Sequence, residues 1–170
     1  SCSGCPAAMN VTAPGGRYTQ NLVPHLYQGS CGGAGAEAYF TFTLAGTSDV
    51  FIATHQSMPV NTVLYVRSGS CTGTQVGCNT NADGLVTSQL TLTNLAAGTY
   101  WVIVDSVSGV APGTPITADI YITTPGNESD RCGRPTFIPP LTASITGSTT
   151  GYADDYLPYR AGATGCSYCG

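Results

Sequence analysis

Hydrophobic and polar residues alternate along the middle of the chain with the period of two that β-strands show. In residues 38–44, Phe40 and Phe42 fall on one face, while Thr41 and Thr43 fall on the other. No stretch shows a sustained period of 3.6 residues, which would indicate an amphipathic helix. The pattern therefore predicts a protein that is built from strands.

Six segments combine this alternation with β-branched or aromatic residues. The predicted strands are residues 38–44, 50–55, 62–66, 89–93, 99–105 and 116–123. Turn-forming residues such as Gly84, Gly98 and Gly113 separate them. In the fifth strand apolar residues occupy both faces, so we expect both of its faces to be partly covered. Short strands at regular spacing without helices predict an all-β fold, an antiparallel β-sandwich.

These strands define the predicted domain organisation. The β-sandwich body covers residues 31–124, and residues 1–30 form an N-terminal flank that we expect to hold a first strand. Residues 125–170 form a C-terminal extension rich in Pro, Gly and Thr, with a further predicted strand at residues 141–146. The extension also contains Tyr152, Tyr156, Tyr159 and Tyr168. So many aromatic side chains favour packing on a surface.

The C-terminal extension repeats features of the N-terminal flank. Cys5 and Pro6 open the first segment, which leads through a Thr-containing strand to Cys31 and Gly32. Cys132 opens the second segment, which leads through a Thr-containing strand to another Cys-Gly pair. The extension thus looks like the opening of a second module, which cannot bury its apolar face alone. We expect it either to fold back onto the body or to dock on another copy.

Eight cysteines in 170 residues indicate a disulfide framework formed in an oxidising compartment. They are Cys2, Cys5, Cys31, Cys71, Cys78, Cys132, Cys166 and Cys169. Cys71 and Cys78 bracket a short loop that contains glycine, so we predict that they pair with each other. The other pairings stay open. The Cys-x-x-Cys spacing at each end also matches half of a zinc site, but the halves lie far apart in sequence and disulfides are preferred.

Charged residues make up only 8% of the chain, and the net charge is -4. Without a basic surface to contact phosphates, nucleic acid is excluded as a partner. No apolar stretch approaches the roughly 20 residues that span a bilayer, so we expect no membrane insertion. A start at Ser1 without an apolar leader predicts a mature or excised chain, secreted or on the cell surface. Asn10 and Asn127 lie in glycosylation sequons and are predicted glycan sites.

Several short motifs follow one another in the body of the chain. They are Cys31-Gly32-Gly33, Tyr39-Phe40-Thr41-Phe42, Asn61-Thr62-Val63-Leu64-Tyr65-Val66, Cys71-Thr72-Gly73 through Cys78-Asn79, Leu90-Thr91-Leu92 and the run from Leu95 to Asp105. In this order they resemble the bacterial pre-peptidase C-terminal domain superfamily, in the tandem-repeat type of secreted and surface proteins. The resemblance implies a jelly-roll-like β-sandwich that serves as an accessory module. Some relatives bind calcium or extracellular polymers such as collagen.

The resemblance also bears on a metal site. The family usually has an Asp at the position of Asn61, and often an acidic pair where this chain has Asn79 and Asn81. Calcium prefers several carboxylate oxygens, so fewer carboxylates mean weaker binding. The resemblance therefore predicts a calcium site of low affinity formed by Asn61, Asn79, Asn81 and Asp83, and we expect no other cofactor.

The chain carries no recognisable catalytic motif. The histidines are His25 and His55, and neither H-E-x-x-H nor G-x-S-x-G occurs. Asp49, Asp105 and Asp119 could pair as carboxylates in principle, but turn and surface roles suffice for them. Because no nucleophile and base come together in the pattern, we expect a protein that is not an enzyme.

Two functions fit these observations. The first is an extracellular structural protein, a subunit of a surface filament in which terminal extensions dock copies head-to-tail. Hydroxyl-rich faces of low charge favour close packing between such copies. The alternative is an accessory module of a secreted peptidase or adhesin, which binds calcium, a glycan or a matrix protein. The expected partners are copies of the chain itself, or else glycans.

Overall fold

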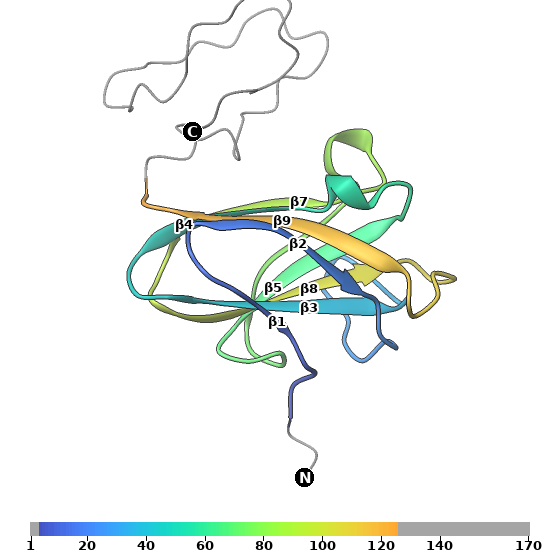
Figure 1. Cartoon of the computed structure of the whole chain (residues 1–170), viewed down its shortest axis with the longest axis horizontal. Coiled ribbons are helices and arrows are strands. Elements are labelled where there is room, and N and C mark those ends of the chain that lie inside the picture. Colours follow the sequence, from blue (N-terminus) through green and yellow to red (C-terminus); the bar gives the residue numbers. More distant parts are fainter. Residues whose placement is uncertain (1–3, 126–170) are drawn as a thin grey trace, which may run out of the picture.

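A computed structural model describes residues 4–125, apart from the side chain of Asp83. The strands are β1 (Met9–Val11), β2 (Gly15–Asn21), β3 (Glu37–Leu44), β4 (Ser48–Ala53), β5 (Thr62–Ser68), β6 (Gln75–Thr80), β7 (Gln89–Leu95), β8 (Gly98–Ser106) and β9 (Pro115–Thr123). One sheet has the order β1-β3-β8-β5-β6 and the other the order β2-β9-β4-β7. The two sheets lie one above the other (Figure 1). The fold is the predicted β-sandwich.

The alternating pattern predicted the central strands correctly. All six predicted strands are present, as β3, β4, β5, β7, β8 and β9, with bounds that agree within two residues. Neighbouring strands are antiparallel, except that β1 runs parallel to β3. The pattern did not predict β6, and it underestimated the N-terminal segment, which supplies β1 to one sheet and β2 to the other. Two short 3-10 helices complete the elements, η1 (His55–Ser57) and η2 (Ala82–Gly84).

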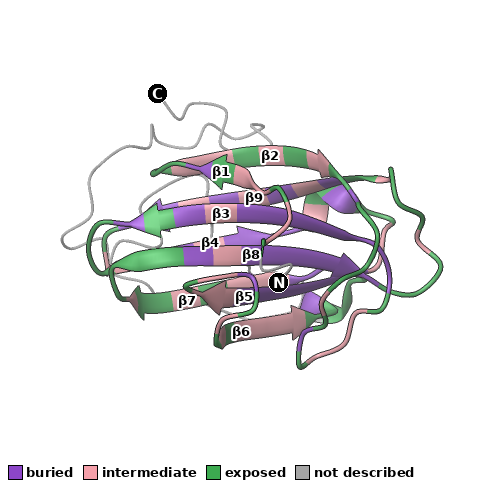
Figure 2. Ribbon diagram, turned by 90° about the horizontal axis from the view of Figure 1, so that it is seen from below, coloured by how far each residue is buried: buried purple, intermediate pink, exposed green. Residues whose placement is uncertain are grey.

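The main core lies between the two sheets. On β3, Phe40 and Phe42 are fully buried as predicted, and the ring of Phe42 stacks on Tyr100 with 5.3 Å between centroids. The facing strand β9 contributes the alternating residues Ile116, Ala118, Ile120 and Ile122. Figure 2 shows that buried residues concentrate along β3 and β8, in the middle of the five-stranded sheet. Burial of this apolar surface is the main force that holds the sheets together.

The five-stranded sheet is also buried on the face that points away from the core. Tyr39, Tyr65 and Ile103 have no exposed surface and form a second apolar cluster there. This confirms the expectation that both faces of the strand at residues 99–105 are covered. Residues 24–36, here called the cover loop, contribute to this cover through Tyr27, whose ring meets that of Tyr39 edge-on with centroids 6.2 Å apart.

The chain enters the cover loop by crossing from one sheet to the other. The Leu22 N–H donates to Thr114 O beside the four-stranded sheet, at 2.9 Å. The next residue, Val23, exchanges hydrogen bonds of 2.7 and 2.9 Å with the main chain of Glu37, at the start of β3. This crossing places the cover loop against the outer face of the five-stranded sheet. Among the described residues, no helix has the length and apolar character to cross a bilayer.

Candidate functional site

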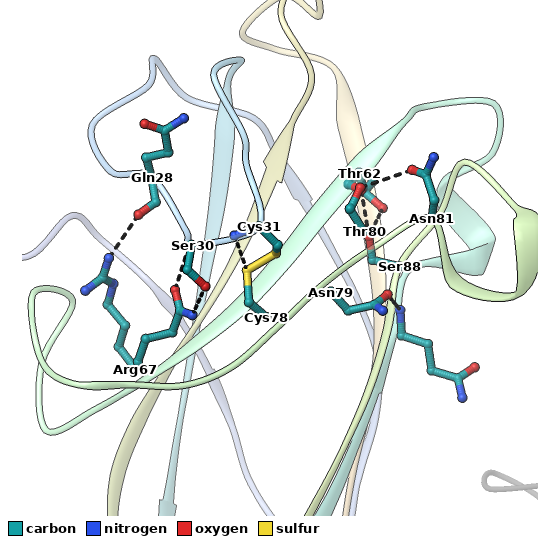
Figure 3. Close-up of a disulfide and its surroundings, with 12 residues drawn as sticks. Gln28, Ser30, Cys31, Thr62, Arg67, Cys78, Asn79, Thr80, Asn81 and Ser88 are labelled. Carbon is teal, nitrogen blue, oxygen red and sulfur yellow. Dashed lines mark hydrogen bonds between the residues drawn. A yellow bond between two sulfur atoms is a disulfide. The ribbon is translucent and has the colours of Figure 1, made fainter.

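Two disulfides fix the N-terminal part of the chain over the outer face of the five-stranded sheet. Cys5 pairs with Cys71 and Cys31 pairs with Cys78, with Cα atoms 5.6 and 5.9 Å apart. The second bond attaches the cover loop directly to β6, as Figure 3 shows. Crosslinks of this kind are typical of proteins outside the reducing cytosol. The two bonds confirm the expectation that Cys5, Cys31, Cys71 and Cys78 form disulfides.

The predicted pairing of Cys71 with Cys78 is wrong. The segment between them is not a simple loop, because its second half forms β6, which pairs with β5. In that pairing Cys78 lies opposite Tyr65 in the middle of the ladder, whereas Cys71 lies in the turn beyond Ser68. Because β6 is extended, it carries Cys78 away from Cys71 along the direction of the strand. Cys2, Cys132, Cys166 and Cys169 lie outside the described residues.

Polar contacts add to the disulfide that holds the cover loop on β6. The Ser30 N–H donates to Gln75 Oε1 at 3.0 Å, and Gln75 Nε2 donates to Ser30 Oγ at 2.6 Å. The Arg67 guanidinium donates to Gln28 O at 3.1 Å (Figure 3). At Gly29 the backbone lies so close to the Tyr65 ring that a Cβ atom would stand 2.6 Å from Cδ1. The cover loop is thus held at several points along its length.

Beneath the cover loop, three titratable side chains form what we call the polar centre: His25, Glu37 and Asp105. Glu37 of β3 and Asp105 of β8 lie directly opposite each other in the antiparallel ladder, and both are fully buried. His25 belongs to the cover loop, and its Nδ1 lies 2.9 Å from Glu37 Oε1 and 3.8 Å from Asp105 Oδ2. Their potential ligand atoms all lie within 4.8 Å of one another.

The hydrogen bonds of the polar centre leave one carboxylate oxygen unsatisfied. Glu37 Oε1 accepts from the Tyr27 N–H at 2.8 Å, and Glu37 Oε2 accepts from the Tyr39 hydroxyl. Asp105 Oδ1 accepts from the Ser106 N–H at 2.7 Å. Asp105 Oδ2 is buried and has no hydrogen-bond partner. An isolated buried carboxylate oxygen is costly, so it points to a missing partner.

The surroundings of the polar centre disfavour negative charge. Burial raises the pKa of Asp105 to about 7 and the charge of Glu37 adds to the effect, while the nearby main-chain N–H groups of Ser106 and Gly35 oppose it in part. Burial also raises the pKa of Tyr39, as does its hydrogen bond to Glu37. The pKa of Tyr65 rises mainly through burial, and the carboxylates of Glu37 and Asp105 contribute. Two carboxylates therefore meet in a region that favours a neutral group or a bound cation.

We expect Asp105→Asn to stabilise the protein when metal ions have been removed. At neutral pH the substitution should raise the free energy of unfolding by about 1–3 kcal/mol, since it removes a buried charge beside another carboxylate. Denaturant unfolding in EDTA measures the change. Asp119→Asn is the matched control, because Asp119 pairs with Arg17 near the surface at 2.7 Å. If Asp105→Asn destabilises the metal-free protein instead, the two carboxylates do not repel as inferred.

The residues of the predicted calcium site lie around the start of η2. Asn79 Oδ1 accepts from the Gln89 N–H at 3.0 Å, and Asn81 Oδ1 accepts from the Thr80 hydroxyl at 3.0 Å (Figure 3). Asn61 Oδ1 is buried without a hydrogen-bond partner. The side chain of Asp83 lies outside the described structure. Two of the three amide oxygens are thus already used within the protein, and the calcium site stays a prediction.

The other residues considered in the sequence lie apart from the polar centre. His55 begins η1, and its ring nitrogens contact Thr87 Oγ1 at 2.8 Å and Gln89 Oε1 at 3.0 Å. Asp49 lies on β4, where its Oδ1 accepts from the Asn94 N–H at 2.6 Å. Asn10 is exposed on β1, so the predicted glycan there has access to solvent. Asn127 lies outside the described residues.

Sequence reasoning did not identify the polar centre as a site. From the sequence, Asp105 is one of three carboxylates that could pair in principle but is assigned a turn or surface role, and Glu37 is not singled out. A signal did exist, because the fifth predicted strand is apolar on both faces and ends in Asp105. A carboxylate in a strand that is covered on both sides is expected to be buried, and buried charges require partners. His25 carried no comparable signal, because only the path of the cover loop brings it to the carboxylates.

Comparisons with known proteins give similarities to solved structures only. No family model and no curated protein sequence matches the chain. The pre-peptidase C-terminal domain of a Bacillus anthracis collagenase is 12% identical, with a TM-score of 0.45 over 71% of this chain and 99% of that one. PliG of Aeromonas hydrophila, a periplasmic inhibitor of g-type lysozyme, is 15% identical, with a TM-score of 0.46 over 69% of this chain and 100% of that one.

A third solved structure is CsCBM6-3 of Clostridium stercorarium, in complex with cellobiose. It is 16% identical, with a TM-score of 0.34 over 71% of this chain and 99% of that one. None of the three structures reaches a TM-score of 0.5. The function of the chain therefore has to be argued from its own residues.

Proposed function

We propose that the chain is a non-catalytic, extracellular structural module that assembles head-to-tail, as a subunit of a surface filament. The proposal rests on the role of the N-terminal segment, meaning here residues 4–31. This segment supplies an edge strand to each sheet and one cysteine to each disulfide. The segment from Cys132 onward resembles it in sequence. A segment of this type is therefore suited to complete a β-sandwich.

The two cysteines that bind the N-terminal segment to the β-sandwich are not free to bind a second segment. Cys71 and Cys78 are both bonded to cysteines of the chain's own N-terminal part. Every copy of the chain has these bonds, so the C-terminal segment would dock on a neighbouring copy without using them. It would instead pair with an open sheet edge, which can accept a strand through main-chain hydrogen bonds. Part of the edge of β3 is a candidate place, because β1 pairs with three of its eight residues and Val23 with a fourth, Glu37. A contact of this kind repeats without closing and so builds a filament.

The outer faces of the sandwich support close packing between copies. Thr19 Oγ1 lies 2.9 Å from Thr117 Oγ1 across β2 and β9, and Thr43 Oγ1 lies 3.1 Å from Thr99 Oγ1 across β3 and β8. Exposed pairs of neutral hydroxyls take the place that charged residues usually occupy on solvent-facing sheets. The low charge reduces the electrostatic repulsion that keeps most soluble domains apart.

Light scattering on the full chain tests this proposal. We expect a mass that rises with concentration well above that of one chain, and a single-chain mass for a chain that ends at residue 125. Ile145→Asp should weaken assembly, because Ile145 lies on the apolar face of the predicted strand at residues 141–146. Ser144→Asp, on the opposite face, is the matched control. A full chain that stays monomeric at every concentration would contradict the proposal and favour the accessory binding module.

A further inference from the structure

We propose that His25, Glu37 and Asp105 bind a divalent metal ion of the zinc class, which ties the cover loop to strands β3 and β8. This inference is independent of the proposed assembly. It starts from two observations that point to the same place. Three potential ligands converge from three different segments of the chain, and the buried Asp105 Oδ2 has no hydrogen-bond partner in the structure.

The geometry of the polar centre suits a small four-coordinate ion. With metal–ligand bonds of about 2.1 Å, two ligands of a tetrahedral zinc ion lie about 3.4 Å apart. Nδ1 of His25 lies 2.9 Å from the Glu37 oxygen and 3.8 Å from the Asp105 oxygen, on either side of that value. Small side-chain rotations would therefore bring the three atoms to a common ion. A solvent molecule can complete the coordination, because His25 is 38% exposed.

The charges of the polar centre favour a bound cation. Within residues 4–125 the arginines are Arg17, which pairs with Asp119, and Arg67, which donates to main-chain oxygens. Neither guanidinium has a contact with Glu37 or Asp105 in the described structure. Their basic neighbour in the described structure is the single imidazole of His25, so the two carboxylates are costly to bury. A divalent ion neutralises both charges and gives Asp105 Oδ2 its missing partner.

The main chain of the cover loop lies close to Asp105 and limits the size of a group that could bind there. Gly33 has a φ of +94°, which favours glycine, and a Cβ atom there would stand 2.0 Å from Asp105 Oδ2. The main chain of the cover loop therefore closes directly over this oxygen. A larger occupant such as an organic ligand does not fit on this side, whereas a single ion between the three ligand atoms needs no such space.

The donor set decides the class of metal. Imidazole nitrogen and carboxylate oxygen together suit Zn²⁺ and its neighbours among the transition metals. Calcium takes six to eight oxygen ligands, and magnesium keeps several waters. The polar centre offers one nitrogen and carboxylates of only two residues, so zinc is favoured over both. The ion would act as a crosslink, in addition to the Cys31–Cys78 disulfide on the same loop.

The test is a zinc titration of the full chain under non-reducing conditions, after removal of metal with EDTA. Calorimetry and elemental analysis are expected to give one ion per chain at this site, and zinc should raise the melting temperature. His25→Ala and Asp105→Asn should weaken binding by more than about 100-fold, since losing even a supporting contact to a metal ligand costs 10–100-fold. His55→Gln, which replaces the other described histidine, should bind as the wild type does.

Two further readouts separate this site from other sources of metal binding. Cobalt in place of zinc should show no thiolate charge-transfer band, which excludes the cysteines as ligands. Both variants should still unfold cooperatively, which would show that a loss of zinc binding is not caused by a loss of folding. Zinc uptake that is unchanged in His25→Ala and Asp105→Asn, or absent in the wild type, would overturn the proposal. A site that prefers calcium to zinc would overturn the metal class.

Discussion

Replacing Cys31 and Cys78 together by alanine is expected to lower the free energy of unfolding by about 4 kcal/mol, given the 47-residue separation that the bond closes. Without the bond, the unfolded chain gains conformational entropy and the cover loop loses its covalent attachment to β6. A loss of this size is a large part of the 5–15 kcal/mol that typically stabilises a domain. Equilibrium denaturation of the oxidised protein measures it.

A different substitution, Cys71→Ala, tests the observed pairing against the Cys71–Cys78 bond that the sequence favoured. In Cys71→Ala the structure predicts that Cys5 becomes the free thiol while Cys31 and Cys78 stay bonded. Peptide mapping with a thiol-blocking reagent identifies the free cysteine. If Cys78 is blocked instead, Cys71 and Cys78 are partners and the attachment of the cover loop is wrong.

Phe42→Ala is expected to cost about 3–5 kcal/mol in the free energy of unfolding, because it leaves a cavity between the sheets. Phe42 is fully buried on the inner face of β3, where its ring stacks on Tyr100. The next residue, Thr43, is exposed on the outer face and contacts Thr99. Thr43→Ala is the matched control and should change stability by no more than about 0.5 kcal/mol. If both variants lost similar amounts of unfolding free energy, the assignment of Phe42 to the inner face and Thr43 to the outer face of β3 would be wrong.

Much of the fold could be predicted from the sequence because the central strands alternate strongly. Phe40, Phe42 and the isoleucines of β9 mark their buried faces plainly. The strands that were missed lie at the edges of the sheets. β2 is polar and half-exposed along most of its length, and β6 has only Val76 and Cys78 as apolar residues, with Gly77 between them. Edge strands bury little apolar surface, so their patterns carry little signal.

The candidate site could not be predicted in the same way, because it depends on contacts that are distant in sequence. Glu37 meets Asp105 through the pairing of β3 with β8, and His25 reaches both through the cover loop. The error at Cys71 and Cys78 has a related cause. Short spacing suggested a local bond, but the strand pairing of β5 and β6 and the crossing at Val23 determined which cysteines meet.

Electron microscopy of the full chain under non-reducing conditions tests the central claim most directly. Head-to-tail assembly predicts filaments that repeat one β-sandwich per subunit along their length. It also predicts that chains ending at residue 125 form only single particles under the same conditions. A field of separate, single-sandwich particles from the full chain, at concentrations where the truncated chain looks the same, would contradict the assembly.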